Sequence, residues 1–213
     1  MDEILEKYSL LQNQNVSRET CMEFESFVGM LQEKNKEINI IGKESAKNEV
    51  IRERHIVDSA QIVEFINLNS NIITDIGSGG GMPGVIMSIM MKKVKNSMKV
   101  HLYEKSHHKS AFLRKVSRDL NLNTKIIEKN IFESQNLESG TIMARAFKPL
   151  PVVLDVVNKN FSSYSNLILF MGKNGQKVLE ETLKNWDFDF VKKKSITSED
   201  SFLLNIKNIK KKN

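Results

Sequence analysis

The stretch Asn71-Ile-Ile-Thr-Asp-Ile-Gly-Ser-Gly-Gly-Gly-Met-Pro-Gly84 decides the fold. Its apolar, β-branched part, Ile72 to Ile76, predicts a buried parallel strand. Glycines then end the strand, and apolar residues resume at helical spacing from Val85 to Met90. A strand, a glycine turn and a helix in this order bring backbone N–H groups and a helix N-terminus to a nucleotide-like ligand. We therefore expect a ligand site at this turn.

The residue types in the turn separate the candidate ligands. Gly79, Gly81 and Gly84 match the spacing of a dinucleotide site, and no Lys-Ser/Thr pair follows as it does in a phosphate-binding P-loop. Asp75 places a carboxylate at the strand end, which repels a pyrophosphate and attracts an ammonium or sulfonium group. The turn resembles the S-adenosylmethionine loop of class I methyltransferases, which implies cofactor contacts from Asp75, Gly77, Gly79 and Gly81. A tight turn that binds nothing is the alternative.

Length and composition favour one domain. The chain has 213 residues, 40% of them hydrophobic, and we expect a single domain over 1–213, with helices in 1–70 and a sheet core in 71–213. The formal charge of +6 favours a polyanionic partner such as nucleic acid. The single cysteine, Cys21, lies on an apolar stripe and is expected in the core of a protein from a reducing compartment. An acidic N-terminus and the lack of long apolar runs predict no signal peptide, no membrane span and a cytoplasmic location.

Two helices are expected before the glycine turn. Ser17 is a candidate N-cap for the first, whose apolar stripe contains Cys21, Phe24, Phe27, Val28 and Leu31. The second is expected over 46–66, with Arg54, His55 and Asp58 on its polar face. Arg54 and Asp58 are one turn apart, so an ordinary ion pair is the alternative to a functional role.

Candidate ligand contacts follow the next strands. The strand over 99–104 ends at Glu104, whose carboxylate can accept hydrogen bonds from ribose hydroxyls. The loop over 130–133 flanks the adenine position, where Ile131 and Phe132 are apolar contacts or simply core. The strand from Thr141 runs toward a turn at Pro149, and Arg145 lies near its carboxyl end, where such sheets bind ligands.

The remaining pattern completes a doubly wound α/β sheet. It predicts helices over 105–118, 151–160 and 175–184, a strand over 166–171 and a closing hairpin from 187–191 and 201–206. Cationic residues on the first of these helices (Lys109, Arg114, Lys115, Arg118) and in the tail (Lys207, Lys210, Lys211, Lys212) are phosphate-binding candidates or merely solvated. The tail is expected to be frayed. The pair His107-His108 is not expected to bind metal, because no Cys or carboxylate cluster completes a site.

Four ordered segments, 35–39, 54–59, 75–84 and 144–150, resemble the bacterial ribosomal RNA small-subunit methyltransferase G family, also called GidB. The resemblance implies a Rossmann-like class I methyltransferase sheet, mostly parallel with an antiparallel closing strand, after an N-terminal helical extension. It implies S-adenosylmethionine as cofactor and methylation of N7 of guanine 527 in the 530 loop of 16S rRNA.

The resemblance also carries over residue by residue. It implies that Gly77 and Met82 touch the cofactor, that Glu104 holds the ribose, and that Ile131, Phe132 and Arg145 complete the site. The chain departs from the family pattern in four places. Lys34 replaces a tryptophan, and Asn39-Ile-Ile41 stands where the family has Asn-Leu-Thr. Asn130-Ile-Phe-Glu133 replaces the usual adenine loop, and Lys173 stands one position along from the family's lysine.

Guanine N7 carries a lone pair and no proton, so no general base is required and no catalytic residue is assigned. Alignment of the reactants supplies the rate enhancement. We expect Arg54, His55, Phe147 and Lys173 to bind the RNA, with Phe147 stacking on the guanine. The expected partner is 16S rRNA, in the small subunit or its precursor, and the protein is expected to be a monomer without metal. Two alternatives are an NAD(P)-dependent oxidoreductase and a noncatalytic RNA-binding protein.

Overall fold

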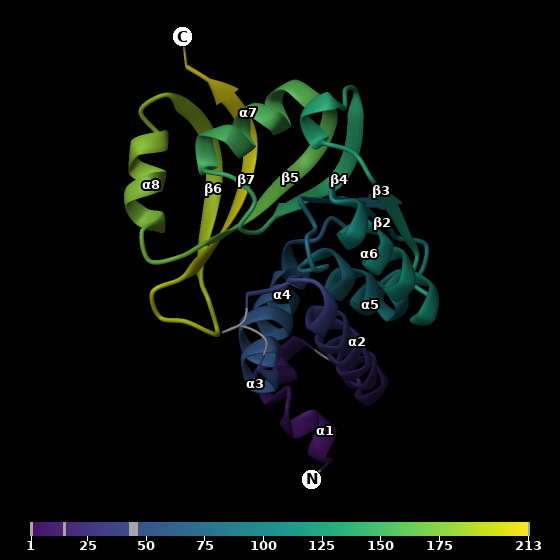
Figure 1. Ribbon diagram of the computed structural model, residues 1–213. Coiled ribbons are helices and arrows are strands. Elements are labelled where there is room, and N and C mark those ends of the chain that lie inside the picture. The colour runs from purple at the N-terminus through teal and green to yellow at the C-terminus, as the bar shows by residue number, and fades with distance from the viewer. Residues whose placement is uncertain (1, 15, 43–46, 213) are drawn as a thin grey trace.

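The computed structural model describes residues 2–14, 16–42 and 47–212, which form a seven-stranded sheet with helices on both faces (Figure 1). The strands lie in the order β3-β2-β1-β4-β5-β7-β6. Their bounds are β1 Ile72–Ile76, β2 Lys99–Tyr103, β3 Thr124–Ile127, β4 Leu137–Ala144, β5 Phe161–Met171, β6 Trp186–Lys194 and β7 Phe202–Lys211. Strands β1 to β5 pair in parallel, and β7 is antiparallel to both β5 and β6. The predicted mostly parallel sheet with an antiparallel closing strand is confirmed.

The central strand β1 sets the position of the loops that follow its neighbours. Ile76 of β1 pairs with Tyr103 of β2, and Asp75 pairs with Met143 of β4. The carboxyl ends of β1, β2 and β4 therefore lie side by side, and the loops that leave them meet at one edge of the sheet.

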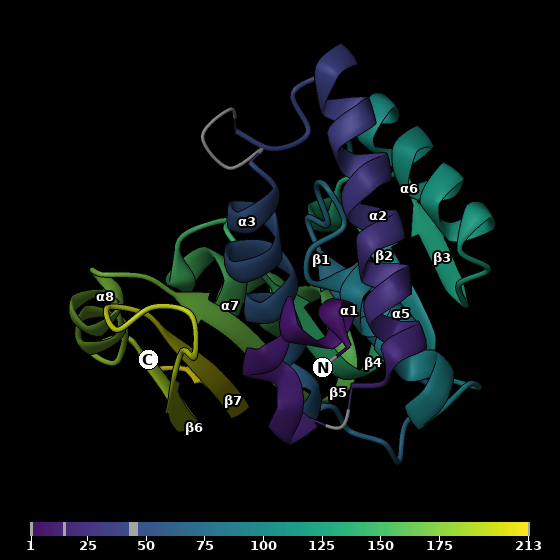
Figure 2. The same ribbon diagram turned by 90° about the horizontal axis from the view of Figure 1, so that it is seen from below.

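Long helices cover one face of the sheet, namely α2 Arg18–Glu37, α5 Gly84–Val94 and α6 His107–Asp119. Figure 2 shows α2 lying along α5 and α6, so α2 forms a further layer over this face. The short α1 Glu3–Glu6 and η1 Ser9–Gln14 pack at the N-terminal end of this layer.

The other face carries η5 Ile131–Glu133, α7 Leu150–Asn160 and α8 Gly175–Thr182. Successive side chains of a strand point to opposite faces, which gives the chain two cores. In β5, Ile168 packs in the core under α2 and α5, whereas Leu167 and Leu169 pack in the core under α7. Both faces of the central strands are thus buried, which explains their nearly continuous apolar sequence.

The first predicted helix is confirmed as α2. The Ser17 hydroxyl accepts a hydrogen bond from the Thr20 N–H (3.3 Å) and caps its N-terminus. All five residues of the predicted apolar stripe, including Cys21, are buried. At the other end, the Asn35 side chain accepts from the N–H groups of Ile40 and Ile41 (2.8 and 2.9 Å) and turns the chain away.

The second predicted helix differs from a regular α-helix. It consists of α3 Asn48–Ile51, a π-helical turn η3 Arg52–Val57, α4 Asp58–Ala60 and a 3₁₀ turn η4 Gln61–Phe65, while residue 46 lies outside the described residues. The π-helical turn ends at Asp58, whose N–H donates to the Glu53 and His55 carbonyls. The alternative that Arg54 and Asp58 form an ordinary ion pair is wrong, because Asp58 pairs with Arg145 instead.

The expectation of a frayed C-terminal tail is also wrong. Strand β7 continues to Lys211, and the N–H of Lys212 donates to the Asn185 carbonyl (2.9 Å). Pairing with β6 holds the lysine-rich segment in the sheet, because Lys210 and Lys211 sit opposite Asp187 and Trp186.

Within the described ranges, no helix is long and apolar enough to cross a membrane. The same part of the chain holds no group of three His, Cys, Asp or Glu side chains placed to bind a metal ion.

Candidate functional site

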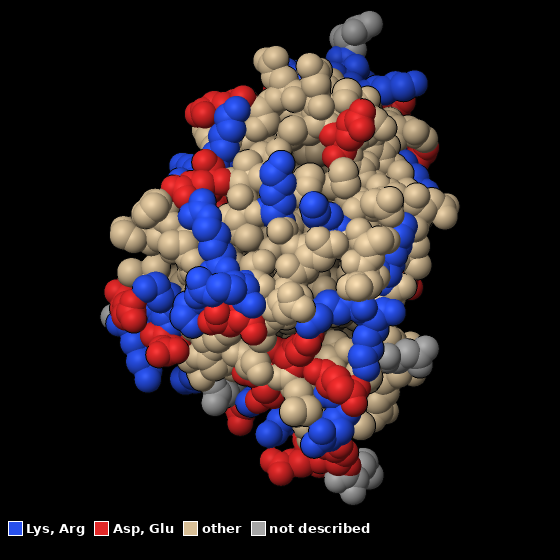
Figure 3. Space-filling model, turned by 90° about the vertical axis from the view of Figure 1, so that its right-hand side faces the viewer, with Lys and Arg blue, Asp and Glu red and all other residues tan. Residues whose placement is uncertain are grey.

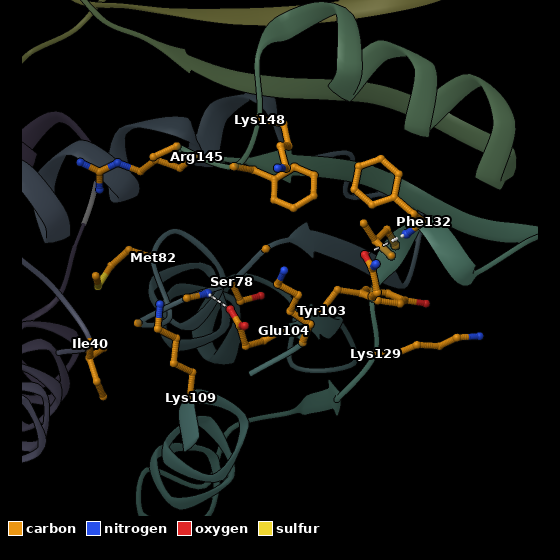
Figure 4. A pocket seen from close by; sticks show the side chains of 18 of the residues that line it. Ile40, Ser78, Met82, Tyr103, Glu104, Lys109, Lys129, Phe132, Arg145 and Lys148 are labelled. Atoms are coloured by element: carbon orange, nitrogen blue, oxygen red, sulfur yellow. Dashed lines mark hydrogen bonds between the residues drawn. The ribbon is translucent and has the colours of Figure 1, made fainter. Parts of the chain in front are cut away.

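A cleft of about 710 Å³ opens at the carboxyl ends of β1 to β4, and its floor is the glycine turn after β1 (Figure 4). Nine of the sequence-predicted site residues line it: His55, Gly77, Gly79, Met82, Glu104, Ile131, Phe132, Arg145 and Phe147. Segments that are far apart in sequence therefore meet here, as the strand-end argument predicts.

The glycine turn is shaped by its backbone. The N–H groups of Gly77 and Ser78 both donate to the Tyr103 carbonyl (3.0 and 2.9 Å), which ties the turn to the end of β2. Gly77 has φ +73°, and a Cβ atom there would lie 2.3 Å from Cδ2 of Phe147. Because of both constraints, the position accepts only glycine, and the ring of Phe147 lies against the turn.

Glu104 holds the turn from the opposite side. One carboxylate oxygen accepts from the Gly79 N–H (2.9 Å; Figure 4), and the other accepts from the Ser106 N–H (2.7 Å). A carboxylate can accept about four hydrogen bonds, so each oxygen keeps a free acceptor position. Glu104 lines the cleft and can still accept hydrogen bonds from two neighbouring hydroxyls.

Asp75 is buried beneath the turn, Gly81 is a buried residue of the turn itself, and neither lines the cleft. One Asp75 oxygen, Oδ2, accepts from the Gly84 N–H at the start of α5 (3.0 Å), and the other, Oδ1, has no hydrogen-bond partner. A Cβ atom at position 84 would lie 2.5 Å from Asp75 Oδ2 and 2.3 Å from Leu102 Cδ2. Gly84, the third glycine of the dinucleotide-like spacing, is thus needed because α5 packs closely against the strands.

Burial is the main cause that raises the pKa of Asp75 to about 7; the nearby Glu104 charge acts in the same direction, and hydrogen bonds act against it. The folded protein therefore keeps a proton that the unfolded chain has released above pH of about 4. The stability that the raised pKa of Asp75 contributes to the folded protein is fully present below pH of about 4. It is lost as pH rises toward about 7.

We predict that Asp75→Asn removes this loss. The asparagine oxygen can still accept from the Gly84 N–H, and no charge is buried. In urea unfolding at a series of pH values, the stability of Asp75→Asn minus that of the wild-type protein should rise between pH of about 4 and 7 and then level off. A difference that stays constant over this range contradicts the buried, protonated carboxyl group.

Arg145 joins the sheet to the N-terminal helices. Its guanidinium forms an ion pair with Asp58 (3.0 Å), and it donates to the Ser59 hydroxyl (3.4 Å) and to the Arg54 carbonyl. Only 18% of the Arg145 side chain and 14% of the Asp58 side chain are exposed, so both charges are largely removed from water. Two of the family-like segments, 54–59 and 144–150, are therefore connected through one side chain.

Asp58 also fixes the turn between β6 and β7. It accepts hydrogen bonds from the side chains of Gln61 (2.7 Å), Ser195 (3.2 Å) and Thr197 (3.1 Å). The Gln61 side chain in turn accepts from the Ile196 N–H (3.1 Å). Asp58 is a structural centre that joins α4, β4 and the closing hairpin.

His55 lines the cleft as a neutral side chain. Burial, together with the nearby charges of Arg145 and Arg54, lowers its pKa to about 4. Its Nε2 atom is buried without a hydrogen-bond partner. Arg54 itself is exposed and lies outside the cleft lining.

Two aromatic rings form one wall of the cleft. Phe132 and Phe147 stack with their ring centroids 6.1 Å apart. Phe132 is 46% exposed. Ile131 is buried in the core under α7, and only a small part of it lines the cleft. The core interpretation therefore holds for Ile131 and not for Phe132.

Lys173 does not line the cleft. It lines a neighbouring cavity of about 420 Å³ at the ends of β4 and β5. Phe147 and Lys148 line both cavities, so they form the partition between them.

The sequence analysis missed several lining residues. They are Ile40, Ser78, Gly80, Tyr103, Lys105, Lys129, Asn130, Ala146 and Lys148, with Lys109 considered only as a member of a helix face. Most of them directly follow a strand, so the strand-end rule that selected Glu104 and Arg145 could also have selected them. Ile40 could not be found this way, because it reaches the cleft from the loop after α2.

Comparison with known proteins gives a family and close relatives. The model of the family "GidB: rRNA small subunit methyltransferase G" matches residues 20–205. The chain is 76% identical to the ribosomal RNA small subunit methyltransferase G of Pelagibacter ubique (strain HTCC1062), over all of both chains. It is 33% identical to the protein of that name from Paracoccus denitrificans (strain Pd 1222), over 90% of this chain and 96% of the relative.

Solved structures share the fold at low sequence identity. A SAM-dependent methyltransferase from Aquifex aeolicus superposes with a TM-score of 0.56 at 11% identity, over 82% of this chain and 97% of that one. The 16S rRNA methylase RmtB superposes with a TM-score of 0.51 at 10% identity, over 90% of this chain and 75% of that one. At these identities the likeness concerns the fold.

Proposed function

Because the chain belongs to the rRNA small subunit methyltransferase G (GidB) family, we propose that it methylates N7 of guanine 527 in the 530 loop of 16S rRNA. The cofactor is S-adenosylmethionine, which supplies an electrophilic methyl group when bound. The observation that carries the proposal is the cleft, where Glu104 faces the glycine turn at the carboxyl ends of parallel strands.

The residues present fit the cofactor. Gly77 lacks a Cβ atom, so the Phe147 ring can lie against the turn that forms the floor of the cleft, and Glu104 has free acceptor positions for two ribose hydroxyls. Phe132 and the edge of Ile131 offer an apolar surface for the adenine. Asp75 lies beneath the turn, and we propose that its effect on the cofactor is indirect, through the position of α5.

The proposed reaction requires no acid or base among the side chains. N7 of guanine has a free lone pair, so no residue has to remove a proton. The chain's task is to align the reacting atoms, which can lower a barrier by about 7–11 kcal/mol. We propose that Phe147, which separates the cleft from the neighbouring cavity, stacks on the target guanine, and that Lys173 and His55 lie near the RNA. Arg54 is a candidate for RNA contact outside the cleft.

The network around Arg145 supports a single methyltransferase domain over residues 1–213, since Arg145 and Asp58 tie the N-terminal helices to the sheet. We propose that Arg145 shapes the cleft through these contacts and that the protein acts as a monomer in the cytoplasm.

Glu104→Gln tests the assignment of the cofactor. The glutamine amide group would face an N–H donor, either of Gly79 or of Ser106, and would lose the charge that strengthens hydrogen bonds. We predict that the Kd for S-adenosylmethionine rises about 10- to 100-fold, measured by isothermal titration calorimetry. Glu138→Gln, an exposed change near the start of β4 and away from the cleft lining, is the matched control and should leave this Kd unchanged. Tight binding of NADH in the same experiment would instead favour an oxidoreductase.

A further inference from the structure

Four lysines surround the cleft, and they come from separate segments. Lys105 follows β2, Lys109 lies on α6, Lys129 follows β3 and Lys148 follows β4, and all of them line the cleft. We refer to them as the cleft lysines. Figure 4 shows Lys148 on the side of the cleft opposite Lys109 and Lys129.

The charges of the cleft lysines are not neutralised, in contrast to those of the neighbouring cations on the outer face of α6. Across the described residues, none of the four ammonium groups has an ion-pair or hydrogen-bond partner. Glu104, the carboxylate in the cleft lining, is already bound to the Gly79 and Ser106 N–H groups. Positive charge is thus left available at the mouth of the cleft.

The other cations of α6 are paired. Arg114 binds Glu128 (2.6 Å), and Lys115 and Arg118 bind Asp119 (2.7 and 3.2 Å). The outer face of α6 therefore contributes little net charge. Of the four cations on this helix that were phosphate-binding candidates, only Lys109 remains one. On the face of the molecule in Figure 3, basic and acidic side chains lie side by side at the lower end, and isolated basic side chains lie over the middle.

An aromatic surface lies between the charges. Phe132 is 46% exposed and stacks on Phe147, which forms the wall of the cleft. Separate point charges around a stacking surface suit a single-stranded nucleic acid, whose phosphates are spaced along the strand and whose bases all have a flat face.

We infer that the cleft lysines bind the phosphates that flank the target nucleotide, so that the RNA strand crosses the cleft from the β2 and β3 side to Lys148. The inference rests on the proposed function for the identity of the RNA. It adds the path of the strand across the cleft, and the paired cations on the outer face of α6 lie outside that path. Two of the C-terminal lysines are also held by the chain itself, since Lys211 pairs with Asp155 (3.8 Å) and Lys212 donates to the Leu183 carbonyl (2.7 Å).

Two variants with equal net charge test the path. The first replaces all four cleft lysines by glutamine, and the second makes Arg114→Gln, Lys115→Gln, Arg118→Gln and Lys159→Gln, which removes four ion-paired cations. Each of the two variants has lost four positive charges, which lowers the formal charge from +6 to +2. Binding of a fluorescent single-stranded RNA of about 20 nucleotides is measured from about 50 to 300 mM KCl, and binding of S-adenosylmethionine is measured in parallel.

For the cleft-lysine variant we expect RNA affinity to fall on the order of 10²-fold at about 0.1 M salt, with the salt slope reduced by about 3. The control variant should keep most of the wild-type slope, and both variants should bind S-adenosylmethionine as the wild-type protein does. An equal loss in both variants would overturn the inference, because net charge alone would then explain it. So would a loss of cofactor affinity in the cleft-lysine variant without a change in RNA affinity. Since this RNA need not be methylated, the result is independent of whether guanine 527 is the target.

Discussion

Gly77→Asp should abolish binding of S-adenosylmethionine while RNA binding persists. Gly77 has φ +73°, a conformation that costs a side-chain-bearing residue about 1–3 kcal/mol. In addition, its Cβ atom would lie 2.3 Å from the Phe147 ring, so either the turn or the ring must move. Because the turn is the floor of the cleft, we expect the Kd for the cofactor to rise about 100-fold or more, measured by calorimetry.

Gly29→Asp is the matched control for this experiment. Gly29 is an exposed residue of α2, and a Cβ atom there meets nothing within 4 Å. This variant adds the same charge to the chain, and it should bind the cofactor and RNA as the wild-type protein does. Unchanged cofactor affinity in Gly77→Asp, with the fold confirmed by circular dichroism, would contradict the location of the cofactor at this turn.

Asp58→Ala should cause the largest loss of stability among single changes in the Arg145 network. The change leaves a mostly buried guanidinium without its ion-pair partner and removes the acceptor used by Gln61, Ser195 and Thr197. Breaking a buried ion pair in this way costs about 3–5 kcal/mol. We expect urea unfolding to show a loss of at least about 3 kcal/mol.

The double variant Asp58→Ala/Arg145→Met separates pairing from general damage. With the guanidinium removed, the loss should be smaller than the sum of the two single losses, which a double-mutant cycle measures. Asp155→Ala is the control, because it breaks surface contacts with Lys159 and Lys211, and it should cost no more than about 1 kcal/mol. If the losses of unfolding free energy at positions 58 and 145 are additive, the two side chains do not stabilise each other, which would contradict the buried ion pair.

Local pattern sufficed to predict the elements that local interactions determine. The run Ile72–Ile76, the glycines and the spacing after Val85 predicted β1, the turn and α5, and the Ser17 cap predicted the start of α2. Glu104 could be assigned for the same reason, since an acid at the end of a parallel strand faces the ligand edge.

Distant pairing could not be read from the sequence. Asp58 and Ser195 are 137 residues apart, and nothing in the spacing of either segment predicts their hydrogen bond. The π-helical turn escaped prediction because the local pattern of residues 52–57 is that of an ordinary helix, and Asp58 meets Arg145 only once the sheet has formed. The frayed tail was predicted from lysine content alone, whereas pairing between β6 and β7 orders that segment.

The most direct test of the account is methyl transfer from labelled S-adenosylmethionine to small ribosomal subunits that lack the modification, and to naked 16S rRNA. The RNA is then digested and the modified nucleoside is identified and mapped by mass spectrometry. The account predicts label in 7-methylguanosine at guanine 527 of the 530 loop, and none in the Gly77→Asp variant. Label on another base, or no label from a protein that binds both cofactor and RNA, would contradict it.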